Sequence, residues 1–431
     1  EKFNHNEILI KPFFEFAPFL IGIAQKNISN HHTPSLLKHV ISFVRDTVGI
    51  FCSVPRAADF LTSIVQMETS ADVYSKACMV FAKIVRIVFL EWMPDQQNPE
   101  DCQFFNQTLL QLLTNFIINA LKQDHEMAQT KGFLKLVVEL LRQHKHPDAV
   151  LTKQFFTKYV VPAAKLTDIE LEEFDNSPNI FISFCFDDSD DRLARPRIFA
   201  AQFVSLIVKQ AENKEKFFSY LIPDSKDPRL FEAQLFLLFV YLKSSPIPEE
   251  LFELLTDLLT QEIQPFLISA ILKVVAMAKK DDDPILGISI FEHYILNSNS
   301  TVIQFTAAWG MLLCFDDFVG DLTEYSSMVS IAHSDLINTL VVLSSIISDS
   351  VISKLIEKIF IIAGGGNSIE IALQMIGFYL AKWEEAQAVD PETAVMFISS
   401  ACNCLAAVSA YTIDHLIPPV VEKLYAHLQQ F

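Results

Sequence analysis

The chain has 431 residues, of which 51% are hydrophobic, and its formal net charge is −19. This length and hydrophobic content predict a large buried interior. The acidic balance argues against binding of a nucleic acid backbone, which needs clustered Lys and Arg. The longest apolar runs are interrupted by charges or, like 235–242, are much shorter than the roughly 20 residues that cross a bilayer, so we predict no membrane insertion.

Apolar residues recur every three to four positions, and the sequence holds only 10 glycines. Both features argue against a sheet protein and predict an all-α chain. No charged-then-apolar leader is visible at the start, so we expect no secretory signal. The seven cysteines lie mostly inside apolar helical runs, which predicts reduced core thiols in an intracellular protein.

The first third of the chain is predicted to form helices without a regular repeat. Breaks are expected at Pro55, at 93–99 and at 144–147, and no linker is long enough to separate domains. The predicted helices span 8–24, 34–51, 56–69, 71–92, 102–122, 126–143 and 148–164.

The segment 166–195 places acidic residues between two apolar helical runs. One acidic group is followed by Asn176-Ser177-Pro178 and Phe181, a second acidic group comes next, and helix resumes at Arg197. The acidic residues are Glu170, Glu172, Glu173, Asp175, Asp187, Asp188, Asp190 and Asp191.

The second acidic group, at 187–191, has more than one interpretation. Asp188 and Asp190 alternate as calcium ligands do, but the Gly of the sharp turn and the closing Glu of an EF-hand are absent. The group is either a solvated loop between repeats or a contact surface for a basic partner, and both interpretations stay open. Taken together, the eight acidic residues are our candidate partner-binding surface.

Helix starts are marked by proline from the middle of the chain onward. Pro228, Pro265, Pro284 and Pro391 each stand where a first helical turn tolerates proline, three of them behind an Asp that can cap free amides. The predicted helix pairs are 228–243 with 247–262, 265–280 with 284–297, 300–316 with 334–348, 350–364 with 367–387, and 391–411 with 413–430.

The first helices of these pairs start near 228, 265, 300, 350 and 391. The spacings scatter around the roughly 40–47 residues of HEAT and armadillo repeats. We therefore predict a HEAT/armadillo-like α-solenoid, a superhelical array of antiparallel helix pairs. It is expected to run continuously over 1–431, with less regular repeats at 1–165, the acidic junction at 166–195 and regular pairs at 196–431.

Groups that could carry chemistry are sparse. Cys402 and Cys404 have no second cysteine pair to complete a metal site, so we expect both in the core. His31-His32 and His144-Lys145-His146 stand at predicted turns without carboxylate or Cys partners. The Gly364-Gly365-Gly366 triplet lacks the strand and the Lys of a phosphate loop, and no nucleophile has a recognisable setting. We predict no enzyme, no metal and no cofactor.

The acidic junction also carries a family resemblance. LTDIELEEFDNSPNIFI at 166–182 resembles the centre of importin-β superfamily transport receptors (karyopherins), where a short helix ending in an E-x-x-E-D-x-P-x-x-F/Y-I run precedes the next repeat. STVIQFTAAWGMLL at 300–313 is similar to a repeat helix of that family. The segment 348–383 resembles a helix pair of importins seven and eight. The exportin that recycles importin-α shares the acidic junction.

The resemblance implies a superhelical HEAT array that binds Ran in its GTP form, basic cargo proteins and phenylalanine-glycine repeats of nucleoporins. It also implies shuttling between cytoplasm and nucleus. The amino-terminal Ran-binding repeats and the carboxy-terminal acidic tail of the family have no counterpart here, so the chain is expected to be a central fragment. A non-shuttling HEAT scaffold or an exportin are the alternatives, and residue types do not distinguish import from export.

Overall fold

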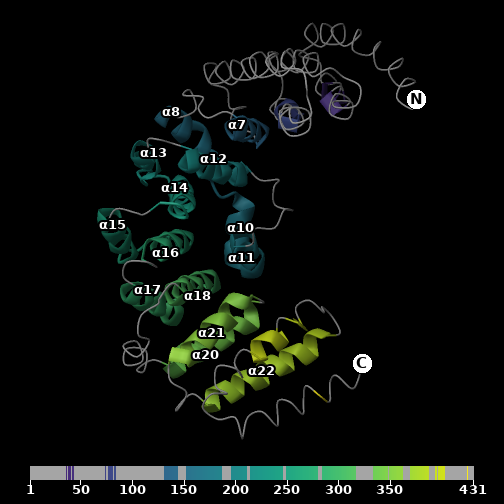
Figure 1. Cartoon of the computed structure of the whole chain (residues 1–431), viewed down its shortest axis with the longest axis vertical. Helices are drawn as coiled ribbons and strands as arrows, with labels where there is room; N and C mark the ends of the chain where they lie inside the picture. Colours follow the sequence, from purple (N-terminus) through teal and green to yellow (C-terminus); the bar gives the residue numbers. More distant parts are fainter. Residues whose placement is uncertain are drawn as a thin grey trace, which may run out of the picture. The chain divides into compact units, whose positions relative to one another are not determined.

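All regular structure in the described residues is helical (Figure 1). The computed structural model describes 131–143, 152–186, 196–210, 214–245, 249–279, 284–316, 333–347, 349–362 and 369–387, together with single residues and short runs within 35–42, 73–83 and 394–402 and residue 425. The all-α prediction is confirmed for these residues. The helices predicted at 8–24, 56–69 and 102–122 lie outside them.

The chain divides into two compact units. Unit 1 comprises Glu1–Lys165 and Ser189–Ser244, and unit 2 comprises Leu166–Asp188 and Ser245–Phe431. The predicted acidic junction at 166–195 is therefore divided, because its residues up to Asp188 belong to unit 2. The expectation of one continuous array over 1–431 stays a prediction.

Three predicted proline starts are confirmed, since helices begin at Pro228, Pro265 and Pro284. At the first of these, the Asp227 carboxylate accepts a hydrogen bond of 2.9 Å from the Arg229 amide and a 3.0 Å hydrogen bond from Lys165 Nζ. The hydrogen bond from Lys165, followed by that from Arg229, lowers the pKa of Asp227. Pro391 lies outside the described residues.

Unit 1 is built on a row of three helices, α7, α12 and α14, each packed on the next. Within it, α7 packs on α12 and α12 packs on α14, while α9 contacts both α12 and α14, and α13 packs on α14. The elements are α7 (Lys131–Gln143), α8 (Lys153–Phe155), η5 (Phe156–Val160), α9 (Val161–Ala164), α12 (Pro196–Gln210), α13 (Lys214–Leu221) and α14 (Pro228–Leu242).

A π-helical turn, η5, interrupts the helix predicted at 148–164. Pro162 follows this turn; it has no amide hydrogen to donate to the carbonyl four residues back, and its ring crowds that carbonyl, so the α-helical pattern cannot continue there. Phe155 and Tyr159 on this segment are buried with their ring centroids 5.5 Å apart. Phe133 of α7 and Phe203 of α12 lie against them, so aromatic packing joins the segment to the row.

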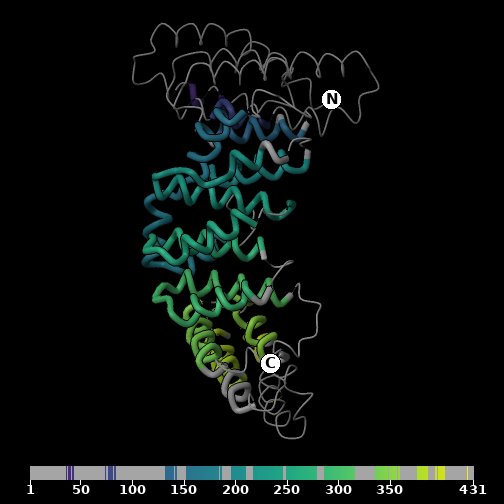
Figure 2. The backbone as a smooth tube through the Cα atoms, turned by 90° about the vertical axis from the view of Figure 1, so that its left-hand side faces the viewer, coloured from purple at the N-terminus to yellow at the C-terminus, as the bar shows by residue number. Residues whose placement is uncertain are grey.

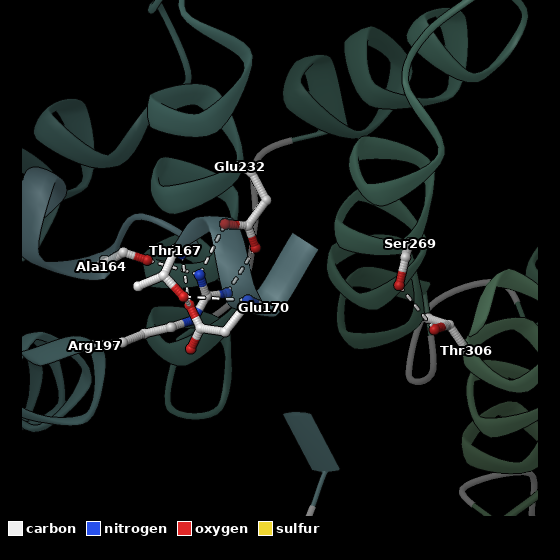
Figure 3. A network of polar contacts seen from close by, with 7 residues as sticks. All are labelled: Ala164, Thr167, Glu170, Arg197, Glu232, Ser269 and Thr306. Carbon is white, nitrogen blue, oxygen red and sulfur yellow. Dashed lines mark hydrogen bonds and ion pairs between the residues drawn. The ribbon is translucent and has the colours of Figure 1, made fainter. Parts of the chain in front are cut away.

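A buried ion pair also joins three elements of unit 1 (Figure 3). The Arg197 guanidinium of α12 donates to both carboxylate oxygens of Glu232 on α14, at 2.8 and 2.6 Å. It also donates to the Ala164 carbonyl at the end of α9, at 2.7 Å, and lies 3.8 Å from the centroid of the Phe236 ring. Both charges are buried, so the cost of removing them from water is offset only while the two side chains keep these hydrogen bonds.

Unit 2 has two rows of helices, which lie side by side in Figure 1, and Figure 2 shows the same helices turned by 90°. In one row α16 packs on α18 and α18 packs on α21. In the other row α17 packs on α20. The two rows meet where α17 packs on α18. The elements are α15 (Glu249–Leu259), α16 (Pro265–Lys279), α17 (Pro284–Asn297), α18 (Thr301–Asp316), α20 (His333–Ile346) and α21 (Ser350–Ile362). Each helix contacts its neighbours along the chain, as in an α-solenoid, and the predicted fold class is confirmed.

The α17–α18 contact is very close at Gly310. A Cβ atom added to Gly310 would lie 2.7 Å from Cε1 and Cζ of Phe291, which is fully buried on α17. In the neighbouring α16–α18 contact, the Ser269 and Thr306 hydroxyls form a buried hydrogen bond of 2.9 Å (Figure 3). Chain order in unit 2 is completed by α22 (Ile369–Gln387).

None of the described helices is long and apolar enough to cross a membrane.

Candidate partner-binding surface

The first acidic group predicted as a partner surface lies on α10 (Asp168–Asn176). This helix begins with a capping box: the Glu170 amide donates to Thr167 Oγ1 at 3.2 Å, and the Thr167 amide donates to Glu170 Oε2 at 2.6 Å. Glu170 is only 4% exposed. Its carboxylate satisfies amides at the helix start and is turned away from solvent, so Glu170 is not part of an accessible surface.

The other acidic residues of α10 differ in exposure. Glu172 and Asp175 are exposed, whereas Glu173 is half-buried, with Oε2 buried and without a hydrogen-bond partner among the described residues. Glu172 and Asp175 stand three residues apart, so they share a face of the helix. Asp187, Asp188, Asp190 and Asp191 lie outside the described residues.

The next helix, α11 (Pro178–Phe186), fastens this segment to unit 2. Phe174 of α10 and Phe181 of α11 meet edge to face with centroids 5.0 Å apart. At the far end of α11, the Phe186 ring lies 5.1 Å from that of Phe305 on α18, and Lys273 Nζ of α16 lies 3.9 Å from its centroid. The segment is thus anchored to helices that follow much later in the sequence.

A side-chain hydrogen bond joins α11 to the end of α20. The Asn179 side-chain amide donates to the Ile346 carbonyl at 2.7 Å. The adjacent Ile180 side chain is 56% exposed, and Val342 and Ile346 of α20 are 59% and 44% exposed. Val342 and Ile346 are four residues apart and share a face of α20.

The exposure of these aliphatic side chains was not foreseen from the sequence. Val342 and Ile346 stand four residues apart, which is the spacing expected of a buried helical face. The periodicity of α20 predicts that one of its faces is buried. Which side chains remain exposed depends on the helices that pack against it. The hydrogen bond from Asn179 to the Ile346 carbonyl joins residues that are 167 positions apart and has no local signal.

No described group of three or more His, Cys, Asp or Glu residues is placed to hold a metal ion. Cys78 and Cys314 are buried thiols, in agreement with the prediction, whereas Cys402 is exposed. The prediction that Cys402 is a core residue is wrong, because helical periodicity alone does not show which face of a helix its neighbours cover.

The shifted pKa values of unit 2 occur on α17. Burial raises the pKa of the Glu292 carboxyl and that of the Tyr294 hydroxyl. The Tyr294 hydroxyl donates to the Leu259 carbonyl at 3.0 Å. Tyr294 therefore joins α17 to the end of α15. The exposed side chains that could meet a partner include the carboxylates of Glu172 and Asp175 on α10.

No protein-family model matches the sequence, and the search of curated proteins finds no match. Among solved structures, the chain is similar to the karyopherin Kap121p bound to the extreme C-terminus of the protein phosphatase Cdc14p, with 11% sequence identity and a TM-score of 0.42. It is also similar to Kap121p bound to Nup53p, with 12% identity and a TM-score of 0.38. These alignments cover 96% and 93% of this chain but 43% and 47% of the Kap121p chains, so this chain spans less than half the length of either.

Proposed function

We propose that this chain is part of a nucleocytoplasmic transport receptor of the importin-β superfamily. The observation that carries the proposal is the segment 166–182, whose residue order resembles the acidic junction of those receptors. We further propose that the chain is a central fragment, most like importins seven and eight, and that its two units belong to one continuous array.

The proposed partners are Ran in its GTP form, basic cargo proteins and phenylalanine-glycine repeats of nucleoporins, with shuttling between cytoplasm and nucleus. A helical array suits this role physically, because each repeat contacts only its neighbours and its curvature changes at low cost. Exposed carboxylates such as Glu172 and Asp175 would attract Lys- and Arg-rich cargo, with an affinity that falls as salt rises.

The proposal is tested by the nucleotide dependence of Ran binding. The full-length protein is immobilised and incubated with Ran loaded with GTP or with GDP. Selective retention of the GTP form supports a transport receptor. Equal retention of both forms, or of neither, contradicts it.

A second measurement separates the proposal from a non-shuttling HEAT scaffold, which the helical array alone would also suit. Immobilised phenylalanine-glycine repeats, with serine-glycine repeats as the control, are incubated with the same protein. A transport receptor binds only the phenylalanine repeats. Failure to bind them, together with stable co-purification of fixed subunits, favours the scaffold.

Retention of cargo in the presence of Ran-GTP distinguishes the two directions of transport. An importin releases its cargo when Ran-GTP binds, whereas an exportin binds cargo together with Ran-GTP, because the sign of the coupling between the sites is opposite.

A further inference from the structure

The two units differ sharply in charge. Unit 1 contains 26 Lys and Arg against 22 Asp and Glu, whereas unit 2 contains 7 against 30. The formal net charge of −19 therefore divides into +4 for unit 1 and −23 for unit 2. In unit 1, α7 packs on α12 (Figure 1), and the sequences of these two helices together contain five Lys and Arg and a single Glu.

Three of these cations follow the contact between α7 and α12. Lys135 Nζ lies 6.0 Å from the centroid of the Phe199 ring on α12. Two turns later on α7, Arg142 Nη2 donates to Gln202 Oε1 at 3.4 Å. Lys209 stands two turns beyond Gln202, so these two residues share a face of α12. We refer to Lys135, Arg142 and Lys209 as the α7–α12 cationic seam.

The seam is open to solvent over much of its length. The Arg142 side chain is 41% exposed, Lys209 is exposed, and Lys135 is half-buried. The carboxylate that these two helices contain, that of Glu139, is buried and forms an ion pair of 2.7 Å with Arg142. The three cations of the seam therefore stand against one carboxylate on α7 and α12.

Carboxylates are few on the neighbouring described elements of unit 1. The segment 153–164, which forms α8, η5 and α9, contains no Asp or Glu. At α14, Glu232 is buried in its ion pair and Asp227 pairs with Lys165. The chain after α12 adds Glu212, which lies outside the described residues, and α13, whose sequence has two Lys and one Glu. An anionic partner would thus meet little repulsion from these elements.

The length of the seam fits an extended acidic peptide. Lys209 stands ten residues beyond Phe199 on α12, which corresponds to about 15 Å at a rise of about 1.5 Å per residue. Alternate side chains of an extended chain are about 6.6 Å apart, so three carboxylates on one edge span about 13 Å. The guanidinium of Arg142 is already engaged by Glu139 and Gln202, so its fork is not open to a phosphate group.

We propose that the α7–α12 cationic seam is a docking surface for a peptide segment in which Asp or Glu occupies alternate positions. A short peptide responds mainly to charges within a Debye length, about 8–10 Å at moderate salt. A long nucleic acid would also be subject to the net charge of −19. This inference does not rest on the proposed transport function, in which the cargo is basic and the contacts are carboxylates.

The test uses the whole chain and two fluorescent seven-residue peptides. One alternates Glu with Ser and the other alternates Gln with Ser. Fluorescence anisotropy is expected to show binding of the Glu/Ser peptide that weakens as NaCl rises, and no binding of the Gln/Ser peptide at the same concentrations. Lys209→Gln is expected to weaken Glu/Ser binding about two- to fivefold, and Lys135→Gln with Lys209→Gln about four- to twentyfold.

Lys226→Gln is the matched control. Lys226 is also exposed and belongs to the same unit. It precedes the start of α14, and the first half of that helix pairs with Arg197 on the first turn of α12, so Lys226 lies toward the opposite end of α12 from Lys209. Lys226→Gln is expected to leave peptide affinity unchanged, and Lys209→Arg is expected to retain it. Circular dichroism of all variants checks that the helices are retained.

Several results would overturn the proposal. Equal binding of the two peptides, no binding of the Glu/Ser peptide, or an equal effect of Lys226→Gln would each do so. Tighter binding of a seven-nucleotide RNA that is lost in Lys209→Gln would show that the seam serves a phosphate backbone instead. Self-association of the chain that is lost in Lys209→Gln would show that carboxylates of a second copy cover the seam.

Discussion

Tyr159 carries a hydroxyl that is buried in the aromatic cluster of unit 1 without a hydrogen-bond partner among the described residues. Burial raises the pKa of this hydroxyl, so it stays neutral at ordinary pH. A polar group removed from water without a new partner lowers the stability of the folded state.

Tyr159→Phe is therefore expected to increase the free energy of unfolding by about 1 kcal/mol, because it removes only the unpartnered hydroxyl. Urea denaturation followed by circular dichroism measures the change. Tyr294→Phe is the contrasting variant: it removes the donor to the Leu259 carbonyl and is expected to lower stability by about 1 kcal/mol. A loss of stability in Tyr159→Phe would show that its hydroxyl has a partner in solution.

The buried Arg197–Glu232 pair gives a second prediction. Arg197→Met leaves the Glu232 carboxylate buried without its cation and is expected to cost about 3–5 kcal/mol. The double variant Arg197→Met with Glu232→Leu is expected to cost less than Arg197→Met alone, because no uncompensated charge remains, although the Ala164 carbonyl still loses its donor.

Denaturant unfolding of Arg197→Met, of Glu232→Leu and of the double variant measures the coupling between Arg197 and Glu232. Additive losses would indicate that the two charges do not depend on one another. Arg197→Lys tests geometry at constant charge, since an ammonium group cannot make the paired hydrogen bonds of a guanidinium.

At the scale of elements, the α17–α18 contact depends on the missing side chain of Gly310. Gly310→Ala raises helix propensity but places Cβ 2.7 Å from the buried Phe291 ring, and we expect a net loss of about 1–3 kcal/mol. Gly377 of α22 has no atom within 4 Å of an added Cβ. Gly377→Ala is therefore expected to stabilise the protein by about 0.5–1 kcal/mol.

Thermal unfolding of both glycine variants checks this contrast. Adding Phe291→Leu to Gly310→Ala relieves the overlap and is expected to recover part of the loss. If Gly310→Ala proves as stable as the original protein, the two helices are separated more widely in solution.

Local sequence signals predicted the helices of the second half well. The proline starts at 228, 265 and 284 and the extents of α14 to α21 agree with the predicted ranges to within a few residues, because caps and periodicity act within one or two turns. The Arg197–Glu232 pair was not predicted, although each is a rare charge in an apolar helix. The pairing of these two side chains is decided by the packing of α12 on α14.

The candidate surface was predicted only in part for the same reason. Acidic residues on α10 could be read from the sequence, but the burial of Glu170 follows from its capping role with Thr167. An S/T-x-x-E pattern signals such a cap, and Thr167-Asp168-Ile169-Glu170 has that form. The exposure of Ile180 and Val342 depends on long-range contacts and has no local signal.

At the scale of the whole molecule, the net charge of −19 implies self-repulsion in the folded state. Raising NaCl from low to moderate concentration screens this repulsion, with a Debye length of about 10 Å at 0.1 M. We expect the midpoint of thermal unfolding to rise over this range. A midpoint that falls with NaCl would indicate that attractive surface ion pairs outweigh the repulsion. The buried Arg197–Glu232 pair is expected to be little affected by NaCl, because buried charges are screened much less.

The chain passes between the two units at 165–166, 188–189 and 244–245, and this order has a consequence during synthesis. About 115 residues separate the end of α11 from the start of α18, on which α11 packs. At a translation rate of about 5–20 residues per second, α11 would wait roughly 6–23 s for that partner. During this interval Phe186, whose ring later meets Phe305 and Trp309 of α18, is without the surface that it packs on. We therefore expect α11 to be a binding segment for a chaperone on the ribosome.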